Sequence, residues 1–271
     1  MAKVRLDTMV HQQGLAPSRE KARAMILAGQ IKVNDQIISK PGTAVDEKAV
    51  IESIVSGCSY VSRGGKKLEK ALDVFDIQVT DLVVMDVGAS TGGYTDCVLQ
   101  RGARRVYAVD VGYGQLDWKL RNDPRVINME RTNIRYLSVA EFPEPVDLVT
   151  IDVSFISVKF VFPVIKSLLI NDGAVVCLVK PQFEAGRNKV GRKGVVRDKD
   201  THQEVLLNSI EHAAQEGLNC VDLTYSPITG PQGNIEFFLY LRQDKQPGAD
   251  IAKKVEQVVN EAHLELGGKR S

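Results

Sequence analysis

Apolar and polar residues follow two recurring patterns along this 271-residue chain. One is a short apolar run rich in β-branched residues, which predicts a strand buried in a parallel sheet. The other spaces apolar residues three and four positions apart, which predicts an amphipathic helix. From residue 66 onward the two patterns alternate, as is typical of a doubly wound α/β fold. The predicted strands lie at residues 82–85, 105–110, 126–128, 146–152, 173–180, 221–225 and 235–241.

The first 58 residues have a different organisation. Apolar spacing predicts a short helix from Arg5 and a clearer one between Ser18 and Gly29, and residues 31–38 predict a hairpin that turns at Asn34-Asp35. Residues 3–40 carry seven Lys or Arg against three acids, a net charge of +4, whereas the whole chain has +1. We therefore expect four parts: a small α+β unit (1–58), a linker (59–65), the main domain (66–245), and a C-terminal helix and tail (246–271).

Composition narrows the class of protein. A hydrophobic content of 44% and a charged content of 25% are ordinary for a soluble globular protein. The four cysteines form no Cys-x-x-Cys pair, which argues against a zinc site and fits the reducing cytoplasm. The N-terminus has no apolar signal segment, and the most apolar stretch is interrupted by Asp152, Lys159 and Lys166. We expect a cytoplasmic protein that binds neither a metal nor a membrane.

A glycine-rich turn, Asp86-Val-Gly-Ala-Ser-Thr-Gly-Gly93, stands between a predicted strand and a predicted helix. This layout presents backbone N–H groups and a helix N-terminus to a ligand. It is not a phosphate-binding P-loop, because no Gly-Lys-Ser/Thr follows, and Ser90 occupies a position where the dinucleotide fingerprint needs glycine. Two functional interpretations are left: a hydrolase nucleophile elbow with Ser90, or the S-adenosylmethionine loop of methyltransferases.

The strand after this turn favours methyl transfer. It ends in Asp110, where a methyltransferase has the acid that holds the cofactor ribose. No His-Gly-Gly segment, which a hydrolase would use for its oxyanion hole, precedes the turn. We therefore rank a methyltransferase above a hydrolase, and both above a tight turn without function.

Four ionisable residues are predicted to converge at one edge of the sheet. Asp152 and Lys180 each end a predicted strand, Glu236 interrupts an apolar strand, and Lys67 precedes the first strand. Each alone is explained by a salt bridge. Together they suit methylation of a hydroxyl, because a lysine made a better base by burial or a nearby cation can accept its proton. The carboxylates would orient the two amines.

The segment from residue 187 to 199 is a second candidate site. It carries six basic residues against one acid, together with Gly191 and Gly194. This composition predicts a mobile loop that clamps phosphates, and a disordered surface loop is the alternative.

Two resemblances sharpen these expectations. Residues Arg5-Leu-Asp7, Ser18-Arg19 and Ala28 to Asn34 resemble the S-four-type (alpha-L) RNA-binding module. From residue 1 to about 245 the chain resembles the TlyA family, cytidine 2′-O-methyltransferases of ribosomal RNA with an FtsJ-like catalytic domain. The stretches that carry this resemblance are Val61 to Leu68, Asp86 to Gly93, Asp110 to Leu116, Arg121 to Arg125, Asp152 to Ser157, Val179 to Glu184 and Gly233 to Glu236.

The family resemblance implies a Rossmann-like fold, S-adenosyl-L-methionine as cofactor, and ribosomal RNA within ribosomal subunits as partner. It places the catalytic set on Lys67, Asp152, Lys180 and Glu236, with Lys66 as the alternative to Lys67. The expected cofactor-binding residues are Asp86, Gly88, Ala89, Ser90, Thr91, Gly92, Gly93, Asp110 and Asn133. The expected RNA-binding residues are Arg5, Arg19, Lys21, Arg23, Lys32, Arg63, Lys66, Arg187, Lys189, Arg192 and Lys193.

Three rival functions belong to other classes. Family members are often labelled hemolysins, and this label suggests a membrane-active protein as the first rival. A serine hydrolase would depend on Ser90, so Ser90→Ala would abolish a hydrolase and at most weaken a methyltransferase. A protein that only binds RNA would result if the enzyme domain were degenerate, but all four candidate catalytic residues are present.

Overall fold

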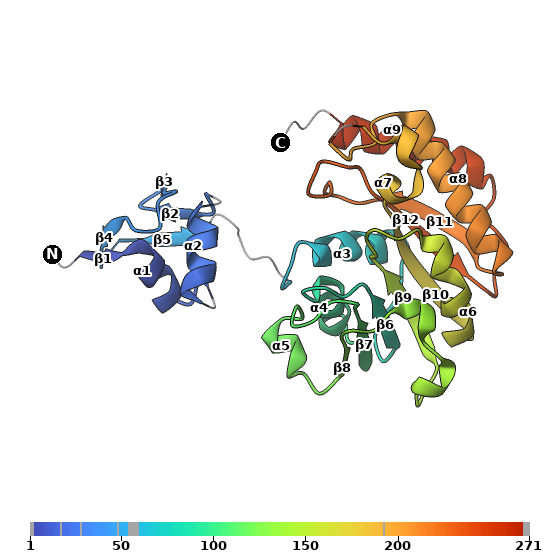
Figure 1. The fold of residues 1–271 in the computed structure, drawn as a ribbon, viewed down its shortest axis with the longest axis horizontal. Coiled ribbons are helices and arrows are strands. Elements are labelled where there is room, and N and C mark those ends of the chain that lie inside the picture. Colours follow the sequence, from blue (N-terminus) through green and yellow to red (C-terminus); the bar gives the residue numbers. More distant parts are fainter. Residues whose placement is uncertain are drawn as a thin grey trace. The chain divides into compact units, whose positions relative to one another are not determined.

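The computed structural model describes residues 3–16, 18–27, 29–47, 49–53, 60–191 and 193–267, without the side chains of Lys21, Ala24, Ser53 and Arg187. The chain divides into two compact units, Met1–Ser59 and Tyr60–Ser271 (Figure 1). Each unit has its own cluster of buried apolar side chains. None of the helices in the described residues is both long and apolar enough to cross a membrane.

The N-terminal unit packs α1 (Leu6–Gln12) and α2 (Arg19–Leu27) together around Leu6, Val10 and Ile26, which are fully buried. Strands β2 (Ile31–Val33), β3 (Gln36–Ile37) and β5 (Ile51–Ser53) form a small antiparallel sheet, and β1 (Lys3–Arg5) pairs with β4 (Ala44–Asp46). The predicted hairpin is confirmed. Asn34 and Asp35 have φ angles of 47° and 66°, as a two-residue hairpin turn requires.

The larger unit is built on a seven-stranded sheet of order β11-β12-β10-β9-β6-β7-β8. Strand β12 is antiparallel to both neighbours, whereas β10, β9, β6, β7 and β8 are parallel. The predicted mixed α/β fold is thereby confirmed. Chain order reverses between β6 and β9, the point of an open α/β sheet where ligands bind. The strands are β6 (Val83–Val87), β7 (Arg105–Val109), β8 (Val126–Met129), β9 (Val146–Ile151), β10 (Leu169–Val179), β11 (Asn219–Tyr225) and β12 (Phe237–Arg242).

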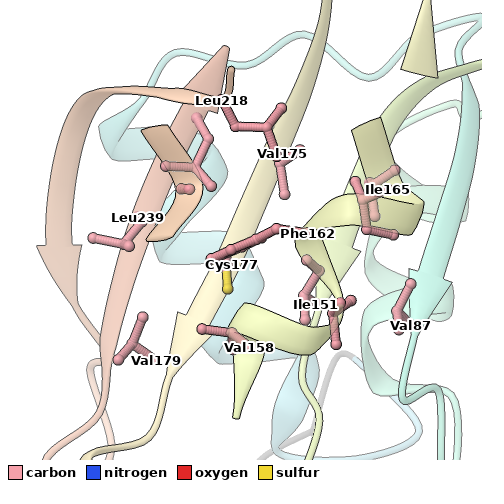
Figure 2. Packing of buried hydrophobic residues seen from close by; sticks show 14 of the residues in the cluster. Val87, Ile151, Val158, Phe162, Ile165, Val175, Cys177, Val179, Leu218 and Leu239 are labelled. Carbon is pink, nitrogen blue, oxygen red and sulfur yellow. The ribbon is translucent and has the colours of Figure 1, made fainter. Parts of the chain in front are cut away.

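Helices cover both faces of this sheet, because successive strand residues point to opposite sides. On β10, Val175, Cys177 and Val179 belong to the apolar cluster that includes helices α6, α8 and α9, and Figure 2 shows part of this cluster. The alternate residues of β10 pack in a second cluster with α3 and α4. The helices are α3 (Gly64–Val74), α4 (Gly93–Gln100), α5 (Trp118–Arg121), α6 (Phe162–Leu168), α7 (Pro181–Glu184), α8 (Lys199–Gln215) and α9 (Ile251–Leu266).

Several boundaries differ from those predicted. Helix α3 begins at Gly64, so the last residues of the predicted linker are helical. Between β9 and β10 the chain forms two helical pieces rather than one, a 3-10 helix, Val158–Phe160, and α6. Pro163 explains the division, because proline lacks an N–H group and favours the first turn of a new helix. Strand β10 begins at Leu169 rather than residue 173, with an irregular register before Ala174.

Candidate active site

The glycine-rich turn lies against the end of β9. Gly88 has a φ of +88°, and a Cβ atom there would lie 2.5 Å from the carbonyl oxygen of Asp152. Only glycine fits both the backbone conformation and this close approach. The N–H groups of Gly88 and Ala89 donate to the Val109 carbonyl, which joins the turn to the end of β7.

A cavity of about 520 Å³ opens beside this turn, at the carboxyl ends of β6, β7 and β9. Its volume is in the range of small-molecule sites. Of the predicted cofactor residues, Gly88, Ser90, Asp110 and Asn133 line it. The sequence prediction did not assign the other lining side chains to the cofactor; they are Val111, Gln115, Thr132, Ile134, Arg135, Val153, Ser154, Phe155 and Ile156.

Asp110 organises one wall of the cavity. Its Oδ2 accepts a hydrogen bond from the Ser90 N–H at 2.8 Å, and its Oδ1 accepts one from the Gly112 N–H at 2.6 Å. The carboxylate therefore ties the glycine turn to the loop after β7. Each carboxylate oxygen has a second lone-pair site, so Asp110 can also accept hydrogen bonds from a diol in the cavity.

Asp86 lies beneath the cavity and does not line it. The residue is fully buried, and its Oδ2 accepts hydrogen bonds from the Thr95 N–H at 2.9 Å and the Thr95 hydroxyl at 2.7 Å. Burial raises the pKa of Asp86 to about 7; hydrogen bonds from Thr95 oppose the rise and the charge of Asp152 adds to it. The other predicted turn residues, Ala89, Thr91, Gly92 and Gly93, are also absent from the cavity lining.

Two ion pairs contain the four predicted catalytic residues, of which all but the half-buried Asp152 are buried. Lys180 Nζ lies 2.6 Å from Asp152 Oδ1 and donates to the Ser154 hydroxyl at 2.9 Å. Lys67 Nζ lies 2.5 Å from Glu236 Oε2. Both lysines are 8% exposed, whereas the neighbouring Lys66 is exposed, so Lys67 is the lysine that contacts Glu236.

The topology of the sheet brings the pairs to one edge. Asp152 follows β9 and Lys180 follows its parallel neighbour β10, so both lie at the carboxyl ends. Val179 faces Phe237 in the antiparallel ladder, which places Lys180 and Glu236 at adjacent positions beyond it. Lys67 reaches Glu236 from α3, and Asp152 also lines the cavity. The two ion pairs therefore lie at the same edge of the sheet as the cavity, with Asp152 common to both.

Ser90 lacks the surroundings of a hydrolase nucleophile. Its hydroxyl donates to Gln115 Oε1 at 3.2 Å, and no histidine is present among the described residues that line the cavity. A serine nucleophile needs an adjacent general base. Within the described part of the chain, no three His, Cys, Asp or Glu side chains gather as the ligands of a metal would.

The predicted RNA-binding arginines of the N-terminal unit are held by one buried acid. Asp7 pairs with Arg5 at 2.6 Å and with Arg19 at 3.4 Å. The hydrogen bond from Arg5, opposed by burial, lowers the pKa of Asp7 to about 2. Arg23 is exposed beside Arg19 on α2, and Lys32 is half-buried on β2.

The predicted basic loop follows α7. It begins with a 3-10 helix at Arg187–Lys189 and includes a turn in which the Gly191 N–H donates to the Val195 carbonyl. Lys193 is exposed, and Lys189 pairs with Glu204. Arg63 is likewise exposed, at the start of α3. Three members of the predicted RNA-binding set, the residue Arg192 and the side chains of Lys21 and Arg187, lie outside the described part of the chain.

Comparisons with known proteins agree with this geometry. Residues 60–243 match the model of the FtsJ-like methyltransferase family, and residues 4–51 match that of the S4 domain. Among curated relatives, YqxC of Bacillus subtilis is 48% identical, covering 99% of this chain and 97% of its own. The 16S/23S rRNA (cytidine-2′-O)-methyltransferase TlyA of Mycobacterium tuberculosis is 42% identical, covering 96% of this chain and 97% of its own.

Solved structures give the same fold. One from Streptococcus thermophilus, whose title names a hemolysin, is 44% identical, covers 98% of both chains and has a TM-score of 0.79. Another, whose title names an S-adenosylmethionine-dependent methyltransferase from Listeria monocytogenes, covers 68% of this chain and 100% of its own. It has a TM-score of 0.50 at 15% identity, which supports the fold alone.

Proposed function

This chain belongs to the FtsJ-like methyltransferase family, and from that premise we propose that it methylates the ribose 2′-hydroxyl of cytidine in ribosomal RNA. The observation that carries the proposal is the pair of buried lysine–carboxylate contacts, Lys180–Asp152 and Lys67–Glu236, beside the cavity at the glycine turn. A lysine pair of this kind has no evident use in binding the cofactor, but it suits the activation of a hydroxyl.

The cavity has features that fit S-adenosylmethionine. Gly88 lets the turn approach the end of β9 closely and lines the cavity, and Asp110 offers carboxylate oxygens to a ribose diol. When bound, the cofactor supplies an electrophilic methyl group on a sulfonium. Asp110, Ser90 and Asn133 would hold it, because they line the cavity at the ends of β6 and β7 and the segment after β8.

The remaining chemistry falls to the four ionisable residues. A 2′-hydroxyl is a poor nucleophile near neutral pH, so it must lose its proton as it attacks. We assign Lys180 as the group that accepts this proton, with Asp152 and Ser154 fixing the position of its Nζ. Only the neutral amine can accept it, so the ammonium of Lys180 must first release a proton to solvent. Lys67, held by Glu236, adds a cation at the same edge. Lys67 and Glu236 are both buried, which limits the competition of water for their contact, whereas Asp152 is half-buried at the cavity.

The substrate assignment rests on the N-terminal unit and on the relatives. The S4 domain is present at residues 4–51, and exposed Arg5, Arg19 and Arg23 lie on it. The named relatives include a 16S/23S rRNA (cytidine-2′-O)-methyltransferase that matches over nearly the full length. A 2′-hydroxyl is also the group that distinguishes RNA from DNA. For these reasons we favour an rRNA methyltransferase over a hemolysin.

Substitution of Lys180 tests the catalytic assignment. Lys180→Ala should lower the single-turnover rate on rRNA by roughly a hundred- to ten-thousandfold, the usual cost of losing a positioned base. Lys180→Arg should fail too, because guanidinium keeps its proton in proteins. Cofactor affinity, measured by calorimetry, should change little in either variant, since Asp110 and the glycine turn are untouched.

The control is Lys253→Ala, which removes an exposed lysine of α9. A near-normal rate for Lys180→Arg would show that this position supplies only charge. Methyl groups mapped to bases rather than to ribose, or no transfer to rRNA by the wild type, would reject the proposed function itself.

A further inference from the structure

The loop before β12 encloses Glu236. The Ser226 N–H donates to the Glu236 carbonyl at 2.8 Å, and the Gly230 N–H donates to the Asn234 carbonyl at 2.9 Å. A Cβ atom at Gly230 would lie 2.6 Å from Glu236 Oε1, so this part of the loop packs directly against the carboxylate. Any shift of the loop would therefore disturb the partner of Lys67.

Asn234, the residue that closes this loop, is fully buried and uses both ends of its amide. Its Oδ1 accepts a hydrogen bond from the Val196 N–H at 3.0 Å, and its Nδ2 donates to the Gly194 carbonyl at 2.9 Å. Both partners belong to the basic segment, about forty residues earlier in the chain. The loop that encloses Glu236 and the basic segment are thus fastened together by one side chain.

The part of the basic segment that Asn234 fastens is a turn, which we call the basic turn and describe at residues 191 and 193–197. The Gly191 N–H donates to the Val195 carbonyl at 3.1 Å, and the Gly194 N–H donates to the Gly191 carbonyl at 2.8 Å. Val195 and Val196 are buried, so the base of the turn is anchored in the protein. Removal of the Asn234 side chain would leave the Val196 N–H and the Gly194 carbonyl without their hydrogen-bond partner.

Two exposed cations lie on the basic turn. Lys193 is at its tip and Arg197 is at its end, and both are exposed. Lys189, before the turn, is instead paired with Glu204. Asp198, after it, caps α8 by accepting hydrogen bonds from the Thr201 N–H and hydroxyl at 2.8 and 2.7 Å. The turn therefore presents positive charge whose natural ligand is a phosphate.

We propose that Asn234 is a positioning residue that fixes the basic turn relative to the Lys67–Glu236 pair, so that an RNA phosphate bound by the turn sets the register of the reacting ribose. The inference rests on the proposed function for the identity of the substrate. In this proposal the basic turn is already held in place before RNA binds, whereas the sequence predicted a mobile clamp. Asn234 itself touches neither substrate nor cofactor, and it acts through the backbone of residues 194 and 196.

A double-mutant cycle between Lys193 and Asn234 tests this coupling. In the wild-type background, Lys193→Ala should weaken binding of an unmodified rRNA transcript several-fold. The magnitude of the slope of log affinity against log salt should fall by about one, as expected for the loss of one phosphate contact. In the Asn234→Ala background the same change should have almost no effect, because the lysine is no longer held in place. Affinity for S-adenosylmethionine should stay within about twofold in every variant.

Lys253→Ala is the matched control, since it removes an exposed lysine elsewhere and should cost the same in both backgrounds. Asn234→Asp repeats the cycle in a second variant, which keeps the acceptor for Val196 but replaces the donor to Gly194 by an acceptor. If Asn234→Ala fails to bind the cofactor, the cycle with Asn234→Asp is the one that tests the coupling. Additive effects of Lys193→Ala in these backgrounds would overturn the inference. A wild-type protein that neither binds nor methylates the transcript would instead reject the proposed function.

Discussion

Buried acids in the larger unit have two kinds of partner. Glu236 faces the ammonium group of Lys67, whereas Asp86 faces only the hydroxyl and amide groups of Thr95 and the hydroxyl of Thr150. Neutral donors compensate less than a cation for the loss of water, and Asp152 adds a like charge nearby. This difference explains why burial raises the pKa of Asp86 to about 7.

The raised pKa of Asp86 gives stability a pH dependence of known sign. The folded protein holds this proton up to about pH 7, but an unfolded aspartate loses it near 3.8, so Asp86 lowers the free energy of unfolding as pH rises between these values. In Asp86→Asn this fall should disappear. In urea unfolding, the free energy of unfolding should fall between pH 5 and pH 7 by roughly 2 kcal/mol more in the wild type than in the variant. An identical pH response in both proteins would contradict this assignment.

Tyr94 gives a second prediction at the scale of one group. Its hydroxyl is buried and has no hydrogen-bond partner among the described residues, and its pKa is raised well above the usual value by burial and by the charges of Asp152 and Glu236. An unpaired buried hydroxyl costs about 1–3 kcal/mol, so Tyr94→Phe should increase the free energy of unfolding by about 1 kcal/mol.

Tyr60 provides the matched control for Tyr94. It is also buried, but its hydroxyl donates to Glu69 Oε1 at 2.7 Å. Tyr60→Phe should therefore destabilise the protein, because Glu69 loses a partner. Chemical denaturation of both variants measures the contrast, and a Tyr94→Phe variant as unstable as Tyr60→Phe would show that the Tyr94 hydroxyl is satisfied.

At the scale of an element, the turn between β6 and α4 depends on Gly88. In Gly88→Ala the new methyl group would overlap the Asp152 carbonyl oxygen at 2.5 Å, so the end of β9 or the turn must move. We expect affinity for S-adenosylmethionine to fall at least tenfold, as measured by calorimetry. Gly102→Ala is the control, since Gly102 has the same φ of +88° but its nearest neighbour would be Thr80 at 3.4 Å. If both substitutions lowered the affinity equally, backbone strain alone would explain the loss of affinity in Gly88→Ala.

Strand ends could be predicted from the sequence because buried parallel strands are short apolar runs that finish at one edge. That rule identified Asp152 and Lys180 as neighbours. It could not choose between Lys66 and Lys67, because adjacent helical residues point about 100° apart and the docking of α3 decides which is buried. The assignment of Asp86 to the cofactor came instead from the resemblance, and in the structure this side chain is fully buried and bonded to Thr95.

Loops of the site were beyond prediction for a different reason. Phe155 lines the cavity with a φ of +63° and a side chain that is 91% exposed. No local sequence pattern predicts a bulky residue in this conformation, because tertiary contacts of the loop after β9 impose it. The sequence also did not predict that Asn234 anchors the basic segment, because the hydrogen-bond partners of Asn234 are distant in sequence.

At the scale of the whole molecule, the two units have separate cores and carry different parts of the proposed activity. Deleting residues 1–59 removes the S4 domain and its exposed arginines but no residue of the cavity. We expect the shortened protein to bind S-adenosylmethionine almost normally, and to bind rRNA more weakly with a smaller salt dependence. Filter binding at several salt concentrations checks this. Undiminished methylation of rRNA would show that the N-terminal unit is dispensable for substrate capture.

The ion pair between Lys67 and Glu236 joins residues 169 positions apart, and this separation has a consequence for synthesis of the protein. Every residue that lines the cavity has been translated by residue 156, whereas Glu236 emerges only with the last strand of the sheet. A nascent chain can therefore contain all the cavity residues before the catalytic set is complete. Under the proposed mechanism, a nascent chain that ends before Glu236 would lack the partner of Lys67 and should not transfer a methyl group.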